Sequence, residues 1–298
     1  GLKDEAAVGR ECSLDVREQH GLHRLQVRLA ARLGGDRPWA IVVYLDEGEL
    51  DLLHLDQLSP VLLMWSINKF GGKMRVYCET FGCTMNRGDS ELMLGCLKAA
   101  GHEPTAKLED ADLLIINTCA VKGPTQRRVL RRLGELRRLD GKRIVVAGCL
   151  PLIDLPSIER LGTFAGIVSC HSVGSIPAVM ERIARGETDV RELGRGPCEK
   201  PCLQKLRSSS VSAIVAISEG CTSICSYCSV RLARGRLHSF SARSILSEIE
   251  DAVGRGYREI LLTSQDTAAY GIDLGTGLPE LLKSITALEG KFKVRVGM

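Results

Sequence analysis

The chain has 298 residues, of which 44% are hydrophobic and 26% are charged, and its formal net charge is +4. This composition is typical of a globular protein long enough for two domains, and the charge is too mild to require a polyanionic partner. The longest apolar run, residues 61–65, is far too short to cross a membrane. The twelve cysteines lack the dense spacing of a small secreted domain, so they predict a reducing, cytoplasmic location with cysteines used as ligands.

The first 73 residues do not share the rhythm of the remainder, and they suggest no chemistry. Residues 22–33 predict a basic amphipathic helix, residues 40–44 predict a strand, and residues 49–58 form a leucine-rich acidic stretch. We therefore treat residues 1–73 as an extension of unknown role. The chain begins at Gly1 without a methionine and stops at Met298 directly after an expected strand, so we expect a piece of a longer protein.

From residue 74 onward, short apolar strands alternate with amphipathic helices, a pattern typical of α/β proteins with parallel sheets. The expected strands are 74–79, 113–117, 144–147 and 165–169, and the expected helices are 88–100, 125–139, 158–161 and 176–185. Residues 74–185 therefore predict a doubly wound parallel-sheet domain. Residues 186–210 are rich in Gly, Pro, Ser and charge, and they predict a linker.

A second α/β run starts at residue 211. Its expected strands are 211–217, 259–263 and 292–296, and its expected helices are 242–255 and 279–288. Repeated strand and helix units build a (β/α) barrel, and about three such units are present. We therefore predict the first units of a truncated partial barrel over residues 211–298.

Three cysteines directly follow the first strand of this second run. Cys221, Cys225 and Cys228 have the spacing C-x3-C-x2-C. Three thiolates cannot close a four-ligand zinc site alone, but they can hold three corners of a [4Fe-4S] cluster and leave the fourth iron open. A substrate or cofactor can bind at an open iron.

A second set of three cysteines is spread along the first domain. Cys83, Cys119 and Cys149 each fall just beyond the carboxyl end of an expected strand. Because parallel strands end along one edge of a sheet, the three thiols are expected to converge there. Gly82 and Gly148, beside two of these cysteines, would let the backbone approach a bulky cluster. The alternative is that all three cysteines are ordinary small buried residues.

The other cysteines carry weaker signals. Single cysteines expected to be packing residues are Cys12, Cys78, Cys96 and Cys170. Cys198 and Cys202 form a C-x3-C in the predicted linker, and we interpret them as surface thiols rather than as a metal site.

The six clustered cysteines stand in longer motifs. Residues 80–86 read TFGCTMN, residues 117–121 read NTCAV and residues 147–149 read AGC. Residues 220–228 are followed by Arg234-Gly-Arg236, and residues 262–271 read LTSQDTAAYG. Over about residues 74–298 these segments resemble the radical S-adenosylmethionine methylthiotransferases. Within that family they look most similar to the archaeal and eukaryotic branch that modifies threonylcarbamoyladenosine in tRNA.

The resemblance implies two [4Fe-4S] clusters and S-adenosylmethionine as cofactors. The open iron of the cluster on Cys221, Cys225 and Cys228 would bind S-adenosylmethionine, and an electron from that cluster would cleave it to a 5′-deoxyadenosyl radical. The radical would remove a hydrogen from C2 of the modified adenosine at tRNA position 37. The auxiliary cluster on the other three cysteines would present a methylated sulfur to the carbon radical, giving a methylthio group on carbon.

Five further residues receive expected roles. Tyr227 would pack against the adenine of the cofactor, although an aromatic residue there could equally belong to a core. Gln265 and Asp266, at the carboxyl end of a strand, are placed to contact cofactor or substrate, or else to cap the loop. Arg234 and Arg236 could pair with the cofactor carboxylate or with RNA phosphates.

The expected partners are tRNA and an electron donor such as a ferredoxin or flavodoxin. Residues 126–139 carry arginines opposite an apolar helix face, and this basic face predicts either a tRNA contact or an ordinary solvated surface. Two other functions stay open at this point. One is methylthiolation of an aspartate on a ribosomal protein, and the other is a non-catalytic iron-sulfur or zinc protein acting in electron transfer or structure.

Overall fold

The computed structural model describes residues 73–297 except 121–122, 140 and 197, together with the backbone of residues 10–18, 21–29, 42–44 and 50–51. The chain divides into two compact units, Gly1–Ser66 and Ile67–Met298.

The described part of the first unit is an antiparallel sheet in the order β1-β2-β3-β4. Its strands are β1 (Arg10–Glu18), β2 (Gly21–Leu29), β3 (Val42–Tyr44) and β4 (Leu50–Asp51). The prediction of a helix over residues 22–33 is wrong, because β2 occupies most of that range. Residues 24–29 alternate polar and apolar side chains with a period of two, which favours a strand over the helix that the basic character suggested.

The second unit is built on a six-stranded sheet in the order β10-β9-β8-β7-β5-β6. Its strands are β5 (Arg75–Thr80), β6 (Glu103–Pro104), β7 (Leu113–Thr118), β8 (Arg143–Gly148), β9 (Gly166–Ser169) and β10 (Val190–Glu192). Every neighbouring pair in this sheet is parallel. All six residues of β7 are buried, as expected for a central strand covered on both faces.

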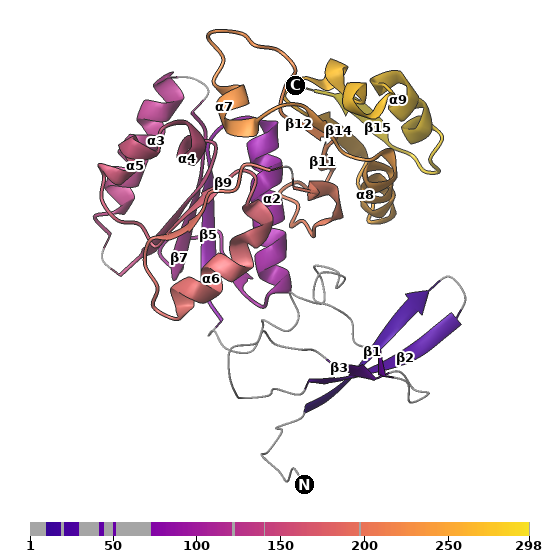
Figure 1. The fold of residues 1–298 in the computed structure, drawn as a ribbon, viewed down its shortest axis with the longest axis horizontal. Helices are drawn as coiled ribbons and strands as arrows, with labels where there is room; N and C mark the ends of the chain where they lie inside the picture. Colours follow the sequence, from indigo (N-terminus) through magenta and orange to yellow (C-terminus); the bar gives the residue numbers. More distant parts are fainter. Residues whose placement is uncertain are drawn as a thin grey trace. The chain divides into compact units, whose positions relative to one another are not determined.

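Helices cover both faces of this sheet, with α3, α4 and α5 on one side and α2 and α6 on the other (Figure 1). Their bounds are α2 (Thr84–Ala99), α3 (Gly123–Leu136), α4 (Leu150–Ile153), α5 (Leu155–Glu159) and α6 (Ile176–Ala184). The hydrophobic core under α3 includes Val129, Leu133 and Leu136 from the helix and Leu114, Ile116 and Val146 from the strands. The doubly wound α/β class is thus confirmed.

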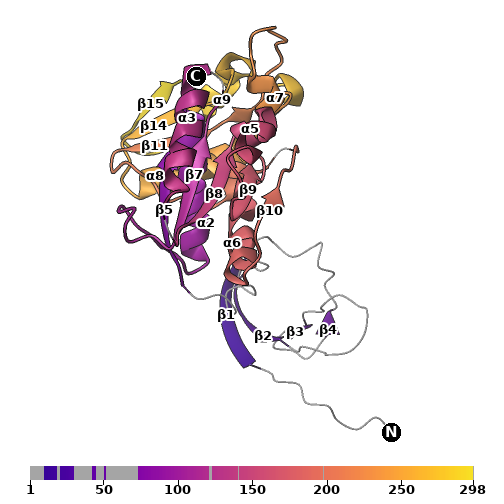
Figure 2. The same ribbon diagram turned by 90° about the vertical axis from the view of Figure 1, so that its left-hand side faces the viewer.

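A second parallel sheet has the order β11-β14-β15, and Figure 2 shows the three strands side by side. The strands are β11 (Ser212–Ala216), β14 (Glu259–Thr263) and β15 (Lys293–Val296), with a small antiparallel pair, β12 (Ser218–Glu219) and β13 (His238–Ser239). The helices are α7 (Val230–Arg234), α8 (Ala242–Gly254) and α9 (Leu278–Thr286), with short 3-10 turns at η4 (Thr267–Ala269) and η5 (Ile272–Leu274). Three strands with intervening helices match the predicted first units of a barrel.

Helix α2 packs against both halves of this unit, the half built on the six-stranded sheet and the half built on the sheet β11-β14-β15. Its Met85 packs in the hydrophobic core of the second sheet, and a Cβ added to Gly88 would lie 3.2 Å from Ile214 of β11. A Cβ on Gly95 would collide with the backbone of Gln204, so a side chain there would displace the segment that joins the two sheets. Glycine at these positions therefore allows α2 to pack closely on both neighbours.

The predicted linker, residues 186–210, is more ordered than its composition indicated. It contains β10, the 3-10 turns of η3 (Lys200–Cys202), and a segment bound to α2 through Glu91. The Glu91 carbonyl accepts a bond from Leu206 N at 2.8 Å, and its carboxylate accepts one from Ser208 N at 2.9 Å. The division into domains at 74–185, 186–210 and 211–298 stays a prediction.

Candidate functional site

Three of the predicted ligands lie at one edge of the six-stranded sheet. Strands β5, β7 and β8 are neighbours and run in parallel, so their carboxyl ends share that edge. Cys119 and Cys149 directly follow β7 and β8, while Cys83 precedes α2 just after β5. Cys119 is 7% exposed and Cys149 is 2% exposed, whereas Cys83 is exposed. This set, Cys83, Cys119 and Cys149, is called the sheet-edge cysteines below.

Asn86 on α2 connects two of the sheet-edge cysteines. Its side-chain Oδ1 accepts from the thiols of Cys83 at 3.6 Å and Cys149 at 3.8 Å. Its Nδ2 donates to the Thr118 carbonyl at 2.9 Å, which fixes the orientation of the amide. Asn86 is 1% exposed. The sequence motif contained this residue, but its spacing alone did not indicate a contact with Cys149.

Gly82 and Gly148 are required by close packing at this edge. Both have positive φ, at 121° and 98°. A Cβ on Gly82 would lie 2.7 Å from Cys119 Cβ, and one on Gly148 would lie 2.5 Å from the Thr118 carbonyl oxygen. Each glycine therefore lets a neighbouring strand end approach, which brings the cysteines together.

The sheet-edge cysteines are not gathered as closely in this structure as the ligands of one metal ion. Ligands of one zinc ion sit about 2.3 Å from it, so their atoms lie within about 4.6 Å of one another. In the described part of the chain, the one group of three potential ligands whose atoms all lie within 4.8 Å is Cys170, His171 and Glu219. The sheet-edge thiols form no such group among the described residues, and a [4Fe-4S] cluster on them stays a prediction.

Cys170 continues the row of cysteines onto the next strand, because it directly follows β9. It is fully buried, as predicted, and packs with Cys149 and Ala233. A hydrogen bond from Cys170 and then the nearby charge of Arg234 lower the pKa of Cys149 to about 6, against the opposing effect of burial. From its place in the sequence Cys170 was expected only to be a packing residue, and its position beside a candidate ligand was not predicted.

The second set of predicted ligands lies in the loop after β12. Cys225 is exposed, and Cys221 and Cys228 are partly exposed. The Cys225 carbonyl accepts from Cys228 N at 3.1 Å, and Cys221 Sγ accepts from Ser223 N at 3.4 Å. We call Cys221, Cys225 and Cys228 the loop cysteines. Their exposure leaves access for a cofactor.

Gln265 and Asp266 lie next to the loop cysteines because β11 and β14 are adjacent and parallel. Gln265 Oε1 accepts from Gly220 N at 2.7 Å, one residue before the first loop cysteine. Asp266 Oδ2 lies 4.0 Å from Cys221 Sγ. The structure therefore brings together both polar residues and the start of the loop, as expected from the ends of parallel strands.

The other predicted cofactor residues divide between surface and interior. Tyr227 is 89% exposed, and the charges of Cys225 and Cys228 raise its pKa. Arg236 is exposed. Arg234, in contrast, is 3% exposed and points into the interior of the unit.

Arg234 belongs to a buried network with two acids and a lysine. Lys200 Nζ lies 2.8 Å from Asp89 Oδ1 and 2.9 Å from Glu219 Oε1. Arg234 Nη2 lies 2.8 Å from Asp89 Oδ2, and its Nη1 pairs with Glu219. The network therefore joins α2, η3, β12 and α7 with two positive and two negative charges. Burial would raise the pKa of Glu219, but Lys200 and Arg234 hold it at about 2.

His171 borders this network. Its Nε2 lies 2.9 Å from the Ala233 carbonyl, and because a carbonyl oxygen only accepts, Nε2 must carry the hydrogen. Its Nδ1 faces Glu219 Oε2 at 3.7 Å. Although this pair lies near the Cys170 thiol, the same carboxylate already pairs with Lys200 and Arg234. Two cations beside the group disfavour a bound metal ion there.

Comparison with known proteins relates this chain to enzymes of one family. Residues 75–168 match the family model described as "Uncharacterized protein family UPF0004". Over 228 residues the chain is 40% identical to a Pyrococcus abyssi protein named "Probable threonylcarbamoyladenosine tRNA methylthiotransferase", covering 76% of this chain and 53% of that protein. Over the matched region the chain is similar to the methylthiotransferases.

Further methylthiotransferases match over the same region. The "Threonylcarbamoyladenosine tRNA methylthiotransferase" of Drosophila pseudoobscura pseudoobscura is 36% identical, covering 76% of this chain and 42% of that protein. The "tRNA-2-methylthio-N(6)-dimethylallyladenosine synthase" of Carboxydothermus hydrogenoformans is 35% identical, covering 74% and 52%. The chain thus spans about half the length of the curated relatives it matches.

A solved structure supports the fold of this chain. The cobalamin-dependent S-adenosylmethionine radical enzyme OxsB, with aqua-cobalamin bound, aligns with a TM-score of 0.51 and 9% sequence identity. The alignment covers 96% of this chain and 48% of OxsB. At that identity the likeness concerns the fold alone.

The arginine-rich segment 127–138, which comprises most of α3 and the residues directly after it, uses part of its basic face for packing. Arg132 pairs with Glu79 at 3.0 Å, Arg128 stacks over the Phe81 ring, and Arg137 stacks over Phe164. Other arginines, Arg127, Arg131 and Arg138, are exposed. The structure therefore assigns half of these six arginines to intramolecular contacts, and a contact of the exposed ones with tRNA stays a prediction.

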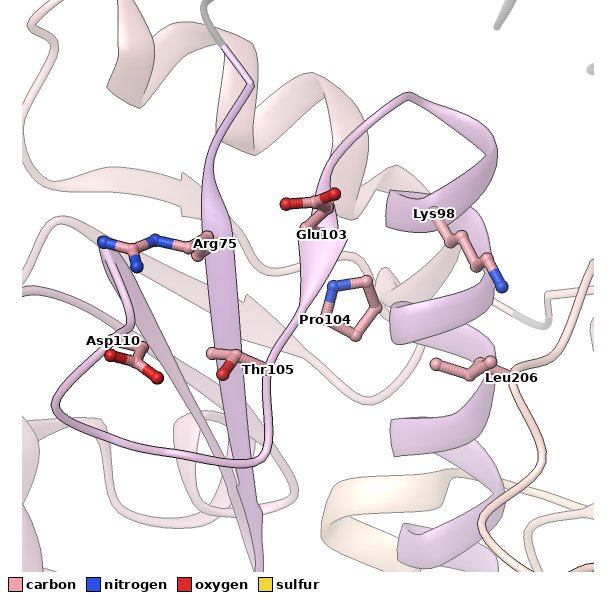
Figure 3. Close-up of a pocket in the computed structure, with 7 residues that line it drawn as sticks. All are labelled: Arg75, Lys98, Glu103, Pro104, Thr105, Asp110 and Leu206. Carbon is pink, nitrogen blue, oxygen red and sulfur yellow. The ribbon is translucent and has the colours of Figure 1, made fainter.

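One shallow pocket lies away from both cysteine sets. It is about 400 Å³ in volume and is formed beside the amino end of β5 by Arg75, Lys98, Glu103, Pro104, Thr105, Asp110 and Leu206 (Figure 3). The sheet-edge cysteines lie at the opposite, carboxyl ends of the same strands. The pocket brings no cysteine or histidine together, so it adds nothing to the candidate site. None of the helices in the described part of the chain is long and apolar enough to cross a membrane.

Proposed function

We propose that this protein is a tRNA methylthiotransferase that places a methylthio group on C2 of N6-threonylcarbamoyladenosine at tRNA position 37. The observation that carries the proposal is the presence of two separate three-cysteine sets in one compact unit. One set lies in an exposed loop, and the other lies at a sheet edge beside a buried cation. Curated relatives with 40% and 36% identity carry the corresponding name.

The loop cysteines, Cys221, Cys225 and Cys228, would hold one [4Fe-4S] cluster, and the sheet-edge cysteines would hold the other. Bound at the loop, such a cluster supplies the electron that cleaves S-adenosylmethionine, and the sheet-edge cluster supplies the sulfur. Gln265 holds the start of the loop through Gly220 N, so it orients the first ligand. The exposed ring of Tyr227 is available to stack on the adenine of the cofactor. Asp266 and the exposed Arg236 are available to bind its polar groups.

The proposed partners are tRNA and a low-potential electron donor such as a ferredoxin or flavodoxin. The exposed arginines of α3 are available for contacts with RNA phosphates, which would make binding salt-dependent. We place the protein in the cytoplasm, where its thiols stay reduced.

Mass spectrometry of tRNA nucleosides tests the substrate. A strain that lacks the gene should lack the methylthio nucleoside, and the full-length gene should restore it. Cys149→Ser and Cys228→Ser should each abolish this rescue, because each removes a ligand of a different set. Cys198→Ser, outside both sets, is the matched control and should rescue.

The same samples distinguish the alternatives. Unchanged tRNA together with a changed ribosomal protein would establish the aspartate-modifying activity instead. A methylthio group found on dimethylallyladenosine would support the methylthiotransferase reaction but would replace threonylcarbamoyladenosine as its substrate.

Metal analysis tests the clusters without reference to tRNA. The anaerobically reconstituted chain should bind about eight iron and about eight sulfide ions if both sets hold [4Fe-4S] clusters. Stoichiometric zinc without visible charge-transfer absorption would refute the cluster assignment. Clusters that never cleave S-adenosylmethionine on reduction would favour a non-catalytic electron-transfer protein.

A further inference from the structure

The last residue of α7, Arg234, is six positions beyond the loop cysteine Cys228, yet its guanidinium lies among residues of the other half of the unit. Arg234 Nη2 lies 2.8 Å from Asp89 Oδ2 and donates to Asn86 Oδ1 at 3.2 Å. Both acceptors are on α2, one turn apart. The segment that follows the loop cysteines thus contributes a buried cation to the sheet edge.

The Asn86 contact places Arg234 within the group formed by the sheet-edge cysteines. The amide oxygen that Arg234 donates to is the same atom that the thiols of Cys83 and Cys149 contact. Arg234 is therefore linked to two proposed ligands through the Asn86 side chain.

The residue type matters because several acceptors must be satisfied at once. A guanidinium has five N–H donors in a planar fork, whereas an ammonium has three donors on one atom. Here the fork serves Asp89 and Asn86 through Nη2 and Glu219 through Nη1. The contacts come from two separate nitrogen atoms of the fork, and a lysine, with a single nitrogen, could not make all of them in the same positions.

A buried cation beside cluster ligands has a defined electrostatic effect. Hydrogen bonds to the sulfurs and the net charge nearby are among the factors that set the reduction potential of an iron-sulfur cluster. Reduction adds a negative charge, and a fixed positive charge in a low-dielectric region stabilises the reduced form. The potential of the sheet-edge cluster should therefore depend on Arg234.

We propose that Arg234 is a positioning residue for the sheet-edge cluster: it holds the Cys149 and Asn86 side of the site and raises the reduction potential of the cluster. The proposal rests on the proposed function, since it requires a cluster on Cys83, Cys119 and Cys149. Its consequence is that the sheet-edge site is complete only when the segment after the loop cysteines is docked against α2.

The test isolates the sheet-edge cluster by replacing the three loop cysteines with alanine in the full chain. Redox titration followed by electron paramagnetic resonance then gives the midpoint potential of the remaining cluster, and iron analysis gives its occupancy. Arg234→Gln is compared with Arg243→Gln, a matched change of an exposed arginine on α8. No step of the measurement depends on catalytic turnover.

Arg234→Gln should lower the reduction equilibrium constant at least tenfold, which is about 59 mV for one electron, while Arg243→Gln leaves it unchanged. Arg234→Lys keeps the charge but not the fork, so we expect about a threefold decrease, or about 28 mV. If the glutamine variant yields no folded protein, the lysine variant decides the question. A wild-type potential in an iron-loaded Arg234 variant would overturn the inference and leave the proposed function standing. No iron in the parent with intact sheet-edge cysteines would refute the proposed function itself.

Discussion

The buried charge network predicts a large loss of stability when its lysine is neutralised. Lys200 is 1% exposed and contacts Asp89 and Glu219 at 2.8 and 2.9 Å. Lys200→Met removes the charge and keeps an unbranched side chain of similar length. It leaves two carboxylates to share the single cation of Arg234. Because removing one partner of a buried ion pair strands a charge without solvent, the free energy of unfolding should fall by about 3–5 kcal/mol at pH 7.

Urea unfolding followed by circular dichroism measures this loss, with wild type and variants prepared under the same anaerobic conditions. The matched control is Arg255→Met, because the Arg255–Asp251 pair has a similar 3.0 Å distance but side chains 62% and 56% exposed. Its cost should stay below about 1 kcal/mol.

A compensating change separates charge from packing. Lys200→Met combined with Asp89→Asn restores one cation for one anion, so it should recover a large part of the lost stability. The reasoning would be refuted if the free energy of unfolding of Lys200→Met lay within about 1 kcal/mol of wild type with an unchanged urea m-value, because a buried carboxylate without its cation would then cost little.

Three more outcomes are expected from the structure. Gly148→Ala should lower both the free energy of unfolding and the sheet-edge iron content, because its Cβ would collide with the Thr118 carbonyl. The control Gly141→Ala is also at positive φ but in open space, so it should cost only about 1–2 kcal/mol of backbone strain. Urea unfolding and iron analysis compare the two variants, and equal effects would contradict the steric argument. Gln265→Ala should weaken S-adenosylmethionine cleavage and loop-cluster occupancy by freeing Gly220 N, measured as 5′-deoxyadenosine formed per iron, with sheet-edge iron unchanged. Burial lowers the pKa of His102 from its usual 6.5, so as pH falls below about 6.5 the imidazole is protonated in the unfolded chain before it is protonated in the folded one, and the folded state loses stability. The urea midpoint should therefore decline less from pH 7.5 to 5.5 in His102→Gln than in wild type. An identical decline in both proteins would contradict the lowered pKa of His102.

The gathering of the sheet-edge cysteines could be predicted from the sequence because it depends on one rule. Parallel strands end on a common edge, and each of the three cysteines follows a strand whose apolar run is easy to recognise. The same rule placed Gln265 and Asp266 beside the loop that contains Cys221. Local patterns sufficed because the sheet supplies the long-range geometry.

The interior charges could not be predicted in this way. Lys200 lies in a segment whose composition indicated a linker, and its partner Asp89 is far away in the sequence. Arg234 follows the loop motif so closely that a role at the cofactor was the natural interpretation. Neither residue has an apolar periodic neighbourhood that marks it as buried, because its burial depends on how α2 packs against the second sheet. The position of Cys170 beside a candidate ligand was missed for a related reason, since it depends on the pairing of β9 with β8, the strand that Cys149 follows.

The packing of the two sheets on α2 has a consequence for how the proposed site forms. Apolar contacts such as Met85 with the β11 core can tolerate a small sliding of one half against the other, but the charge network cannot. If the halves slide by one helical turn, Asp89 is separated from both Lys200 and Arg234 and stays buried without a partner, while the two cations are left with Glu219 alone. The network thus selects one register between the halves. In that register Arg234 reaches Asn86, so the contacts that fix the packing of the unit also complete the sheet-edge site.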